Sequence, residues 1–383
     1  MRLIIILQRF LLNITRWGFP KWENRDSPTL VQAQIWFSRS IKIRKPSRVL
    51  QREWLIILLS FTLILSQPTY ADDYFVQQRD VQAFINHMVK THQFKKTQLI
   101  ALFSKVKLRP QVVHHVKKPL EKKPWLTYQM LFVNEWRIKH GVEFWKKYEK
   151  ALKKAEKTFG VPAGIIVATI GIETKYGQRT GDYRVIDSLT NLAFSHSSRS
   201  AFFRRELEHF LLLTKEQHLD PLKVMGSYAG AIGQPQFMPS SYRHYAINFS
   251  NSGKIDLIHN EVDVIGSIAN YYKKNGWKPN EPIIIQASVS PNRYHYLIKN
   301  NKIGQAIKLS ELLSDGVVLK NKIKQDSLKV KIIEFQNHYS KEYWLGFRNF
   351  NVIKRYNSSD LYALAVYQLN TYITELRDKL DHG

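Results

Sequence analysis

The chain of 383 residues contains no cysteine. Disulfide bonds, thiolate metal sites, a cysteine nucleophile and an acylated lipoprotein-type cysteine are therefore excluded. Acidic residues are scarce as well, since 31 Asp and Glu face 58 Lys and Arg, and the formal net charge is +27. Such an excess of positive charge suits nucleic acid, an anionic membrane surface or an acidic polymer such as a cell wall. Charge alone does not choose among these partners.

Several chemical signatures are also missing. The sequence has no G-x-x-x-x-G-K-S/T phosphate loop, no H-E-x-x-H zinc motif and no G-x-S-x-G nucleophile elbow. It contains no repeat of fixed period and no low-complexity block. Hydrophobic residues make up 44% and aromatic residues 13%, which is ample for a packed core. We therefore expect a folded protein that holds no metal and no other cofactor.

The amino-terminal region has the layout of a secretory signal. An apolar run at 54–65 follows basic residues at 44–52 and precedes the small residue Ala71. The run is too short to span a membrane comfortably, so we predict a signal peptide at 49–71 that is cleaved after Ala71. An uncleaved membrane anchor is the alternative. Because signals begin at the start of a chain, residues 1–48 are interpreted as a mis-assigned upstream extension.

Export narrows the choice of partner. Without residues 1–71 the chain remains strongly basic. An exported basic protein favours an anionic partner outside the cytoplasm over nucleic acid. The sequence therefore predicts a periplasmic protein that faces the cell wall.

The apolar spacing predicts a mainly α-helical (α + β) protein. Residues 107–124 are typical of a basic, proline-marked surface connector, and residues 283–335 contain short β-rich pieces between basic loops. Helices are expected in the following segments: 76–106, as two short helices split near His92, then 142–159, 161–177, 202–213, 263–274 and 361–379.

The helix at 161–177 carries one carboxylate, Glu173, among residues that are almost all apolar. Pro162 suits the first helical turn, and Gly177 suits a left-handed residue just past the end. A desolvated carboxylate keeps its proton to higher pH, which a general acid requires. The alternative is a glutamate that simply reaches solvent at the helix end.

A second segment, 225–245, combines three closely spaced glycines with Gln236 beside Phe237. Glycine allows the backbone to approach a ligand closely, and glutamine beside aromatic rings suits the hydroxyl and acetamido groups of a sugar. The alternative is a tight loop ahead of a helix that is capped by Ser240 or Ser241.

Four segments then reveal a family resemblance. They are IGIETKYG at 170–177, GSYAGAIGQPQFMPSSYRHYAINFS at 226–250, VIGSIANYYKKNGW at 264–277 and RYNSSDLYALAVYQL at 355–369. In order and spacing they resemble the signature segments of the B-type lytic murein transglycosylases, soluble and membrane-bound. The resemblance implies cleavage of the MurNAc-β-1,4-GlcNAc bond of peptidoglycan without water, which leaves a 1,6-anhydro-MurNAc end.

The resemblance also implies roles for single residues. Glu173 matches the family's one catalytic acid and base. Arg199 matches one of two arginines that meet the peptide stem, but Ser198 is its neighbour here, with Arg204 and Arg205 as candidates to compensate. The remaining implied positions bind the sugar chain or stack on it: Ser227, Gln236, Tyr128, Tyr271, Tyr356, Asn357 and Tyr362.

A single carboxylate is consistent with that reaction. Hydrolytic glycosidases ordinarily pair two carboxylates, whereas the acidic residues nearest in sequence to Glu173, Asp182 and Asp187, lie in less apolar segments. The implied mechanism needs no second one, because the C6 hydroxyl of the sugar closes the ring and an intramolecular nucleophile has a high effective molarity.

The sequence departs from the family at its EF-hand-like calcium loop. The equivalent stretch is 248–259, where positions one, three and five are Asn, Ser and Ser and position twelve is His259. Calcium prefers several anionic oxygens, but only Asp256 supplies one and Lys254 opposes the cation. We predict that the loop is kept as structure and that calcium does not bind tightly.

The resemblance implies a lysozyme-like catalytic core with helical and small mixed accessory elements. We expect a helical region at 72–140, the core at 141–282, a basic mixed insertion at 283–341 and a helical segment at 342–383 that returns to the groove. The expected partners of this monomer are glycan strands with peptide stems and not nucleic acid. A catalytically weak peptidoglycan-binding module of the same fold is the alternative function.

Overall fold

A computed structural model describes residues 75–108, 123–195, 197–321, 323 and 327–382. The chain divides into two units, Met1–Tyr70 and Ala71–Gly383, and the described residues all belong to the second. The predicted upstream extension, the predicted signal peptide and most of the predicted connector at 107–124 lie outside the described residues.

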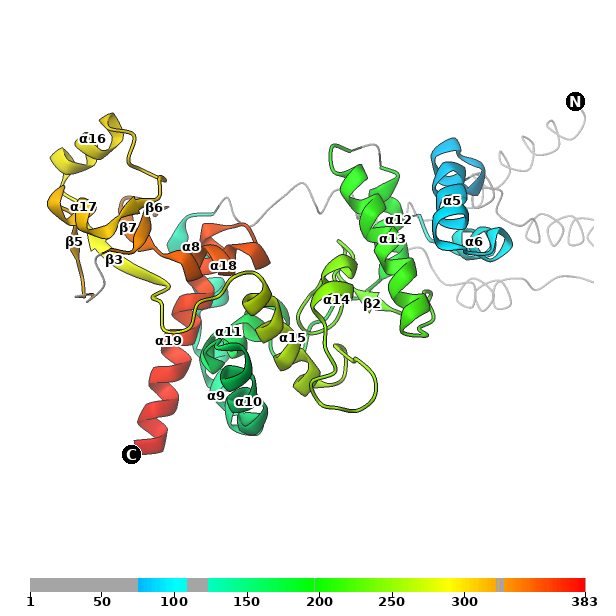
Figure 1. The fold of residues 1–383 in the computed structure, drawn as a ribbon, viewed down its shortest axis with the longest axis horizontal. Helices are drawn as coiled ribbons and strands as arrows, with labels where there is room; N and C mark the ends of the chain where they lie inside the picture. Colours follow the sequence, from blue (N-terminus) through cyan, green and yellow to red (C-terminus); the bar gives the residue numbers. More distant parts are fainter. Residues whose placement is uncertain (1–74, 109–122, 196, 322, 324–326, 383) are drawn as a thin grey trace, which may run out of the picture. The chain divides into compact units, whose positions relative to one another are not determined.

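Helices account for most of the described chain, as the apolar spacing predicts (Figure 1). Two short antiparallel strands, β1 (Tyr183–Arg184) and β2 (Met225–Gly226), interrupt them. The helices before the main sheet are α5 (Arg79–His92), α6 (Lys96–Phe103), α8 (Trp125–Phe132), α9 (Glu135–Lys147), α10 (Glu149–Phe159), α11 (Ala163–Thr174), α12 (Val185–Ala193), α13 (Ser200–Glu216), α14 (Pro239–Tyr245) and α15 (Glu261–Lys274).

Helix α11 lies at the centre of the larger hydrophobic core. Every residue from Ala163 to Ile172 is buried, because small and apolar side chains surround this helix instead of following one face. It packs against α9, α10, α15 and α19, the last of which runs beside it in Figure 1. A helix enclosed in this way has a fixed position, so a side chain at its end is held by the whole core.

The two ends of α11 differ in detail from the expectation. Pro162 is the N-cap residue and not a member of the first turn. The helix ends at Thr174, and Lys175, Tyr176 and Gly177 follow with φ angles of 51, 59 and 85°. Gly177 is left-handed as predicted, but two other left-handed residues precede it. Three such residues in a row turn the chain sharply away just after Glu173.

The expected helix at 142–159 is two helices. Helix α9 begins earlier, because the Asn134 side chain accepts a hydrogen bond from the Arg137 N–H at 3.0 Å and caps it. Tyr148 leaves the helical backbone, with φ −113° and ψ 23°, and separates α9 from α10. The apolar spacing continues across this break, since Tyr148 still packs on Phe144 with 4.7 Å between ring centroids, and so the pattern did not reveal it.

Residues 284–346 contribute a five-stranded antiparallel sheet with the order β4-β6-β7-β3-β5. This part has a hydrophobic core of its own, which includes Leu297, Leu309 and Leu345. Its elements are β3 (Ile284–Ser288), α16 (Pro291–Lys299), β4 (Ile307–Lys308), α17 (Leu309–Ser314), β5 (Val318–Leu319), β6 (Lys329–Gln336) and β7 (Lys341–Gly346).

After β7 the chain returns to the helices through α18 (Arg348–Tyr356) and α19 (Asp360–His382). Helix α19 contacts α8, α9, α11 and α18. This return brings Tyr362 to Glu173, which precedes it by 189 residues. Among the described residues no single helix is long and apolar enough to cross a membrane; α10 and α11 pass that test only as a pair, with a bend of 115°.

Candidate active site

Glu173 occupies the last turn of α11 and is partly exposed. The Tyr362 hydroxyl of α19 donates a hydrogen bond to its Oε1 at 2.6 Å. Because the core packs around α11, the backbone that carries this carboxyl group is held in place. Among the described residues Glu173 has one direct polar partner, and that partner is a phenol.

Four tyrosines lie close enough to this carboxyl group for its charge to raise their pKa, and we call them the tyrosine cage: Tyr271 and Tyr272 of α15, Tyr356 of α18, and Tyr362. The rings of Tyr356 and Tyr362 stack with centroids 6.4 Å apart, and those of Tyr271 and Tyr356 are 4.8 Å apart. Burial, together with the nearby charge of Glu173, raises the pKa of all four phenols. The cage therefore stays neutral and presents only apolar rings and hydrogen-bond donors.

The cage changes the proton affinity of Glu173. Burial raises the pKa of its carboxyl group from 4.5 to about 7, and the hydrogen bond from Tyr362 lowers it by less. No other acidic or basic group among the described residues contributes to this shift. The negative end of the α11 dipole lies beside Glu173 and also opposes its charge. Near neutral pH this carboxyl group can therefore both give and take a proton.

Hydrogen bonds hold the cage in place. The Tyr356 hydroxyl donates to the Pro235 carbonyl at 2.6 Å, and the Tyr271 hydroxyl donates to the Arg355 carbonyl. The hydroxyls of Tyr272 and Thr169 lie 2.8 Å apart, which ties α15 to α11. These bonds connect the Gln236 loop, α18 and the two core helices into one support for the carboxyl group.

Ser227 and Gln236 belong to a tight loop that their own side chains hold together. Ser227 Oγ accepts hydrogen bonds from the N–H groups of Ala229 at 3.2 Å and Ala231 at 3.0 Å. Gln236 Nε2 donates to the carbonyls of Thr180 and Gly233, both at 2.9 Å. Within the described residues no hydrogen bond joins either side chain to Glu173. Both residues thus shape the loop next to the cage, as the alternative interpretation of this segment also predicts.

The helix that follows this loop is not capped by serine. Its N-cap is Met238 with Pro239 at the first position, so the expected cap at Ser240 or Ser241 is wrong. Ser240 instead donates through its N–H and its hydroxyl to the buried carboxylate of Glu206, at 3.0 and 2.7 Å. Glu206 thus accepts the N–H of the second helical residue, which is a group that an N-cap side chain would otherwise satisfy.

Gln234 is a residue beside the site that the sequence analysis missed. Its carbonyl accepts a hydrogen bond from Thr174, the neighbour of Glu173, at 3.0 Å. A Cβ atom at Gly177 would lie 2.9 Å from its side chain, so this close contact needs glycine. Gln234 Oε1 is buried and has no hydrogen-bond partner among the described residues. Only the position of Gln234 inside the 226–250 segment could have pointed to it.

The other predicted binding residues lie at different places. Asn357 follows Tyr356 of the cage in the sequence and is the C-cap of α18. Its Oδ1 accepts the Ser359 N–H at 3.1 Å. Arg199 is exposed at the start of α13, with its guanidinium 5.1 Å from the centre of the Phe203 ring. Arg204, one of two candidates to compensate for Ser198, forms an ion pair with Asp80 at 2.9 Å.

The aromatic groove positions need a correction. Tyr128 is only 2% exposed and stacks on Trp125 inside the core, so it has no free ring face for a sugar. Tyr362 is also 2% and Tyr271 7% exposed, and both contribute to the cage. A pattern of aromatic residues does not distinguish a ring that stacks on a ligand from one that packs beneath it.

The loop at 248–259 does not have the chemistry of a tight calcium site. Asp256 and the fully buried Asp263 accept backbone N–H groups of the loop itself, and Asn248 Oδ1 accepts the Ser252 N–H at 2.9 Å. Lys254 is exposed on the same loop. Hydrogen bonds thus stabilise the turn in the way that a cation would, and the absence of tight calcium binding stays a prediction.

Comparisons with known proteins agree with this geometry. The family described as Transglycosylase SLT domain matches residues 76–371. Membrane-bound lytic murein transglycosylase B of Escherichia coli (strain K12) is 35% identical over 317 residues, which cover 79% of this chain and 85% of that protein.

Two solved structures from Pseudomonas aeruginosa are also similar. Soluble lytic transglycosylase SltB1 is 40% identical with a TM-score of 0.71 and covers 77% of this chain and 98% of its own. SltB3 in complex with NAG-NAM-pentapeptide is 25% identical with a TM-score of 0.69 and covers 78% of this chain and 80% of its own.

Proposed function

Because this chain belongs to the lytic murein transglycosylase B family, we propose that it cleaves the MurNAc-β-1,4-GlcNAc bond with Glu173 as its only acid and base. Membership makes the chain a lytic transglycosylase of peptidoglycan with a lysozyme-like, mainly helical fold. The bond, the 1,6-anhydro-MurNAc product and the residue that performs the reaction are our proposal.

One observation supports this proposal above the others: an isolated carboxyl group whose pKa is about 7. A hydrolase of the ordinary kind needs a second carboxylate to activate water or to form a covalent intermediate. Asp187, a nearby acidic residue in sequence, is fully buried and held by Arg184 at 2.7 Å, so it is not available. In this proposal Glu173 serves both halves of the reaction by itself.

The two halves balance without water. In the first, protonated Glu173 gives its proton to the glycosidic oxygen, the C1–O bond of MurNAc breaks, and the GlcNAc end leaves as an alcohol. The MurNAc acetamido oxygen stabilises the positive charge at C1. In the second half, Glu173 takes the proton of the C6 hydroxyl of MurNAc, and the O6 atom of that hydroxyl bonds to C1. The enzyme ends protonated as it began, and the new end is a 1,6-anhydro ring.

The tyrosine cage supplies the conditions for this sequence of steps. Tyr362 holds Oε1, which leaves Oε2 to exchange the proton with the sugar. The apolar rings limit the access of water, and water is the competing nucleophile. The C6 hydroxyl belongs to the same MurNAc residue as C1, so it is already positioned as the nucleophile and no separate group has to activate water.

The remaining groups bind the substrate in this proposal. Ser227, Gln236 and Asn357 lie in the loops next to the cage and orient the sugars, while the exposed Arg199 meets the peptide stem. SltB3 binds NAG-NAM-pentapeptide, which supports a stem-bearing glycan as the ligand. A periplasmic location, reached through the signal at 49–71, agrees with this substrate.

The test is a digestion of peptidoglycan sacculi by the purified full chain, with the released muropeptides identified by mass spectrometry. We expect products that are lighter by one water than hydrolytic products. Glu173→Gln should abolish their release while the variant still sediments with sacculi. Glu135→Gln is the matched control, because it makes the same change at an exposed carboxylate of α9 and should release products like the unaltered chain.

Two other results would contradict the proposal. Products with ordinary reducing ends would mean that water is the nucleophile. Binding to sacculi without any release, by both the unaltered chain and Glu173→Gln, would favour the peptidoglycan-binding module of the same fold.

A further inference from the structure

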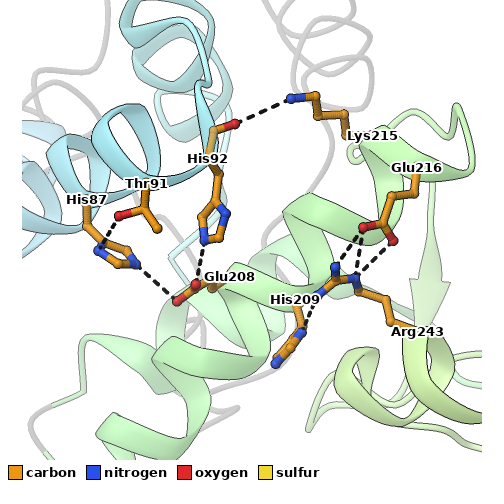
Figure 2. A network of polar contacts seen from close by, with 8 residues as sticks. All are labelled: His87, Thr91, His92, Glu208, His209, Lys215, Glu216 and Arg243. Atoms are coloured by element: carbon orange, nitrogen blue, oxygen red, sulfur yellow. Dashed lines mark hydrogen bonds and ion pairs between the residues drawn. The ribbon is translucent and has the colours of Figure 1, made fainter.

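A second cluster of ionisable side chains lies away from Glu173, where α5 meets α13. Figure 2 shows His87 and His92 of α5 directed at Glu208 of α13. His92 Nε2 lies 2.6 Å from Glu208 Oε1, and His87 Nε2 lies 3.4 Å from Glu208 Oε2. One ligand atom from each residue can be chosen so that all three lie within 4.8 Å of one another. Two imidazole nitrogens and one carboxylate oxygen thus lie close together.

The surroundings hold these groups in a ligand-like arrangement. Thr91 Oγ1 lies 3.3 Å from His87 Nδ1, so this hydroxyl can fix the orientation of the His87 ring, whose Nε2 faces Glu208. Burial raises the pKa of Glu208, but hydrogen bonds from His92 and then His87 outweigh this and lower it overall. Glu208 is therefore an anion at neutral pH. Lys215 donates to the His92 carbonyl at 3.4 Å and not to any of the three ligand atoms (Figure 2).

The chemistry of this set is specific. Calcium and magnesium prefer oxygen ligands, whereas imidazole nitrogen with carboxylate oxygen suits zinc and its neighbours among the divalent transition metals. Three protein ligands with one open side are typical of a four-coordinate ion that keeps one water. The side chain of His87 is 47% exposed, which provides that open side and a path for the ion.

We propose that His87, His92 and Glu208 bind one divalent transition-metal ion of the zinc type, and that the bound ion fastens α5 to α13. This differs from the expectation of no metal. That expectation rested on motif spacing, and Glu208 lies 116 residues beyond His92 in the sequence. The proposal does not depend on the lytic activity, since none of these residues contacts Glu173 or the tyrosine cage among the described residues.

The test is a calorimetric titration of Zn²⁺ into the full chain, prepared without a polyhistidine tag and stripped with a chelator. We expect one saturable equivalent, and binding at least about 10-fold weaker in His87→Gln and in His92→Gln. Thr91→Val, which removes only the supporting hydroxyl, should weaken binding by about 10-fold. His209→Gln is the matched control, because His209 follows Glu208 in α13 but contacts Arg243 at 2.6 Å instead (Figure 2).

A second measurement separates a specific site from loose binding to surface histidines. Zn²⁺ should raise the melting temperature of the unaltered chain and of His209→Gln, but not that of His87→Gln, because only a ligand of the folded state stabilises it. Co²⁺ in place of Zn²⁺ should give the intense visible absorption of a four-coordinate ion. The proposal is wrong if the unaltered chain has no saturable site, or if His87→Gln binds Zn²⁺ as tightly as the unaltered chain.

Discussion

Glu173 and Glu208 are the same kind of residue in two opposite surroundings. Glu173 has aromatic rings around it and a single neutral donor, so burial dominates and raises its pKa to about 7. Glu208 has two histidines within 3.4 Å, and their hydrogen bonds outweigh burial and lower its pKa. The hydrogen-bonding partners, and not burial alone, thus decide whether a carboxyl group becomes a proton donor or an anion.

The largest expected difference between the two residues is in catalysis. Glu173→Gln should lower the rate of muropeptide release by about 10³-fold or more, because a general acid and base typically contributes a factor of that order. Glu208→Gln should leave the rate within about twofold, since it lies outside the cage. Rates with sacculi as substrate measure both. Equal losses of rate in the two variants would contradict the different roles assigned to Glu173 and Glu208.

Stability should respond to Glu173→Gln with a sign that depends on pH. The folded pKa of Glu173 lies above the unfolded one, so the folded state favours the protonated form and loses stability as pH rises from 4.5 through about 7. Removing the charge should therefore stabilise the chain at pH 8 by up to roughly 3 kcal/mol and leave it nearly unchanged at pH 4. Urea unfolding at the two pH values measures this gain. A variant less stable than the unaltered chain at pH 8 would contradict it.

Tyr362→Phe removes the one hydrogen bond to Glu173. The bond lowers the pKa of Glu173, so its loss should move the alkaline limb of the activity profile to higher pH. The rate at neutral pH should fall roughly tenfold, since a hydrogen bond to an ionisable group is worth about 1.5–3 kcal/mol. The pH dependence of kcat/KM reports both effects. Tyr296→Phe, at an exposed tyrosine of α16, is the control and should change neither.

The smallest effect is expected for the stability of Glu208→Gln. The lowered folded pKa of Glu208 contributes stability above the unfolded pKa, which is lost as pH falls through the folded value. The variant should therefore be less stable than the unaltered chain at pH 7, by about 1 kcal/mol or less for a partly exposed pair, with the difference vanishing in acid. Chelator-treated protein keeps metal out of this measurement. A gain in stability at pH 7 would contradict the assigned surroundings.

The sequence predicted the parts that depend on local pattern. The apolar run around Glu173 indicated a buried helix, and the apolar spacing located most of the other helices. Both features depend only on residues that are close together in the sequence. The break at Tyr148 was missed for the same reason, since side-chain packing continues across it.

The site required contacts that no local pattern contains. Tyr362 reaches Glu173 across 189 residues, and only the family resemblance pointed to it. The same resemblance suggested Tyr128 as a stacking residue, although the fold buries its ring. Gln234 and the cluster of His87, His92 and Glu208 depend on side chains that meet only in the folded chain, so spacing did not reveal them.

The most direct test of the central claim is a titration of the Glu173 carboxyl group itself. The full chain, with glutamate labelled by ¹³C at the side-chain carboxyl, is followed by NMR from pH 4 to 9, and the Glu173→Gln spectrum identifies the signal. We expect that signal to titrate near pH 7, well above the ordinary glutamate value of 4.5. A midpoint near 4.5 would show that the surroundings of Glu173 do not raise its pKa. The proposed role of Glu173 as both acid and base would then lose its physical basis.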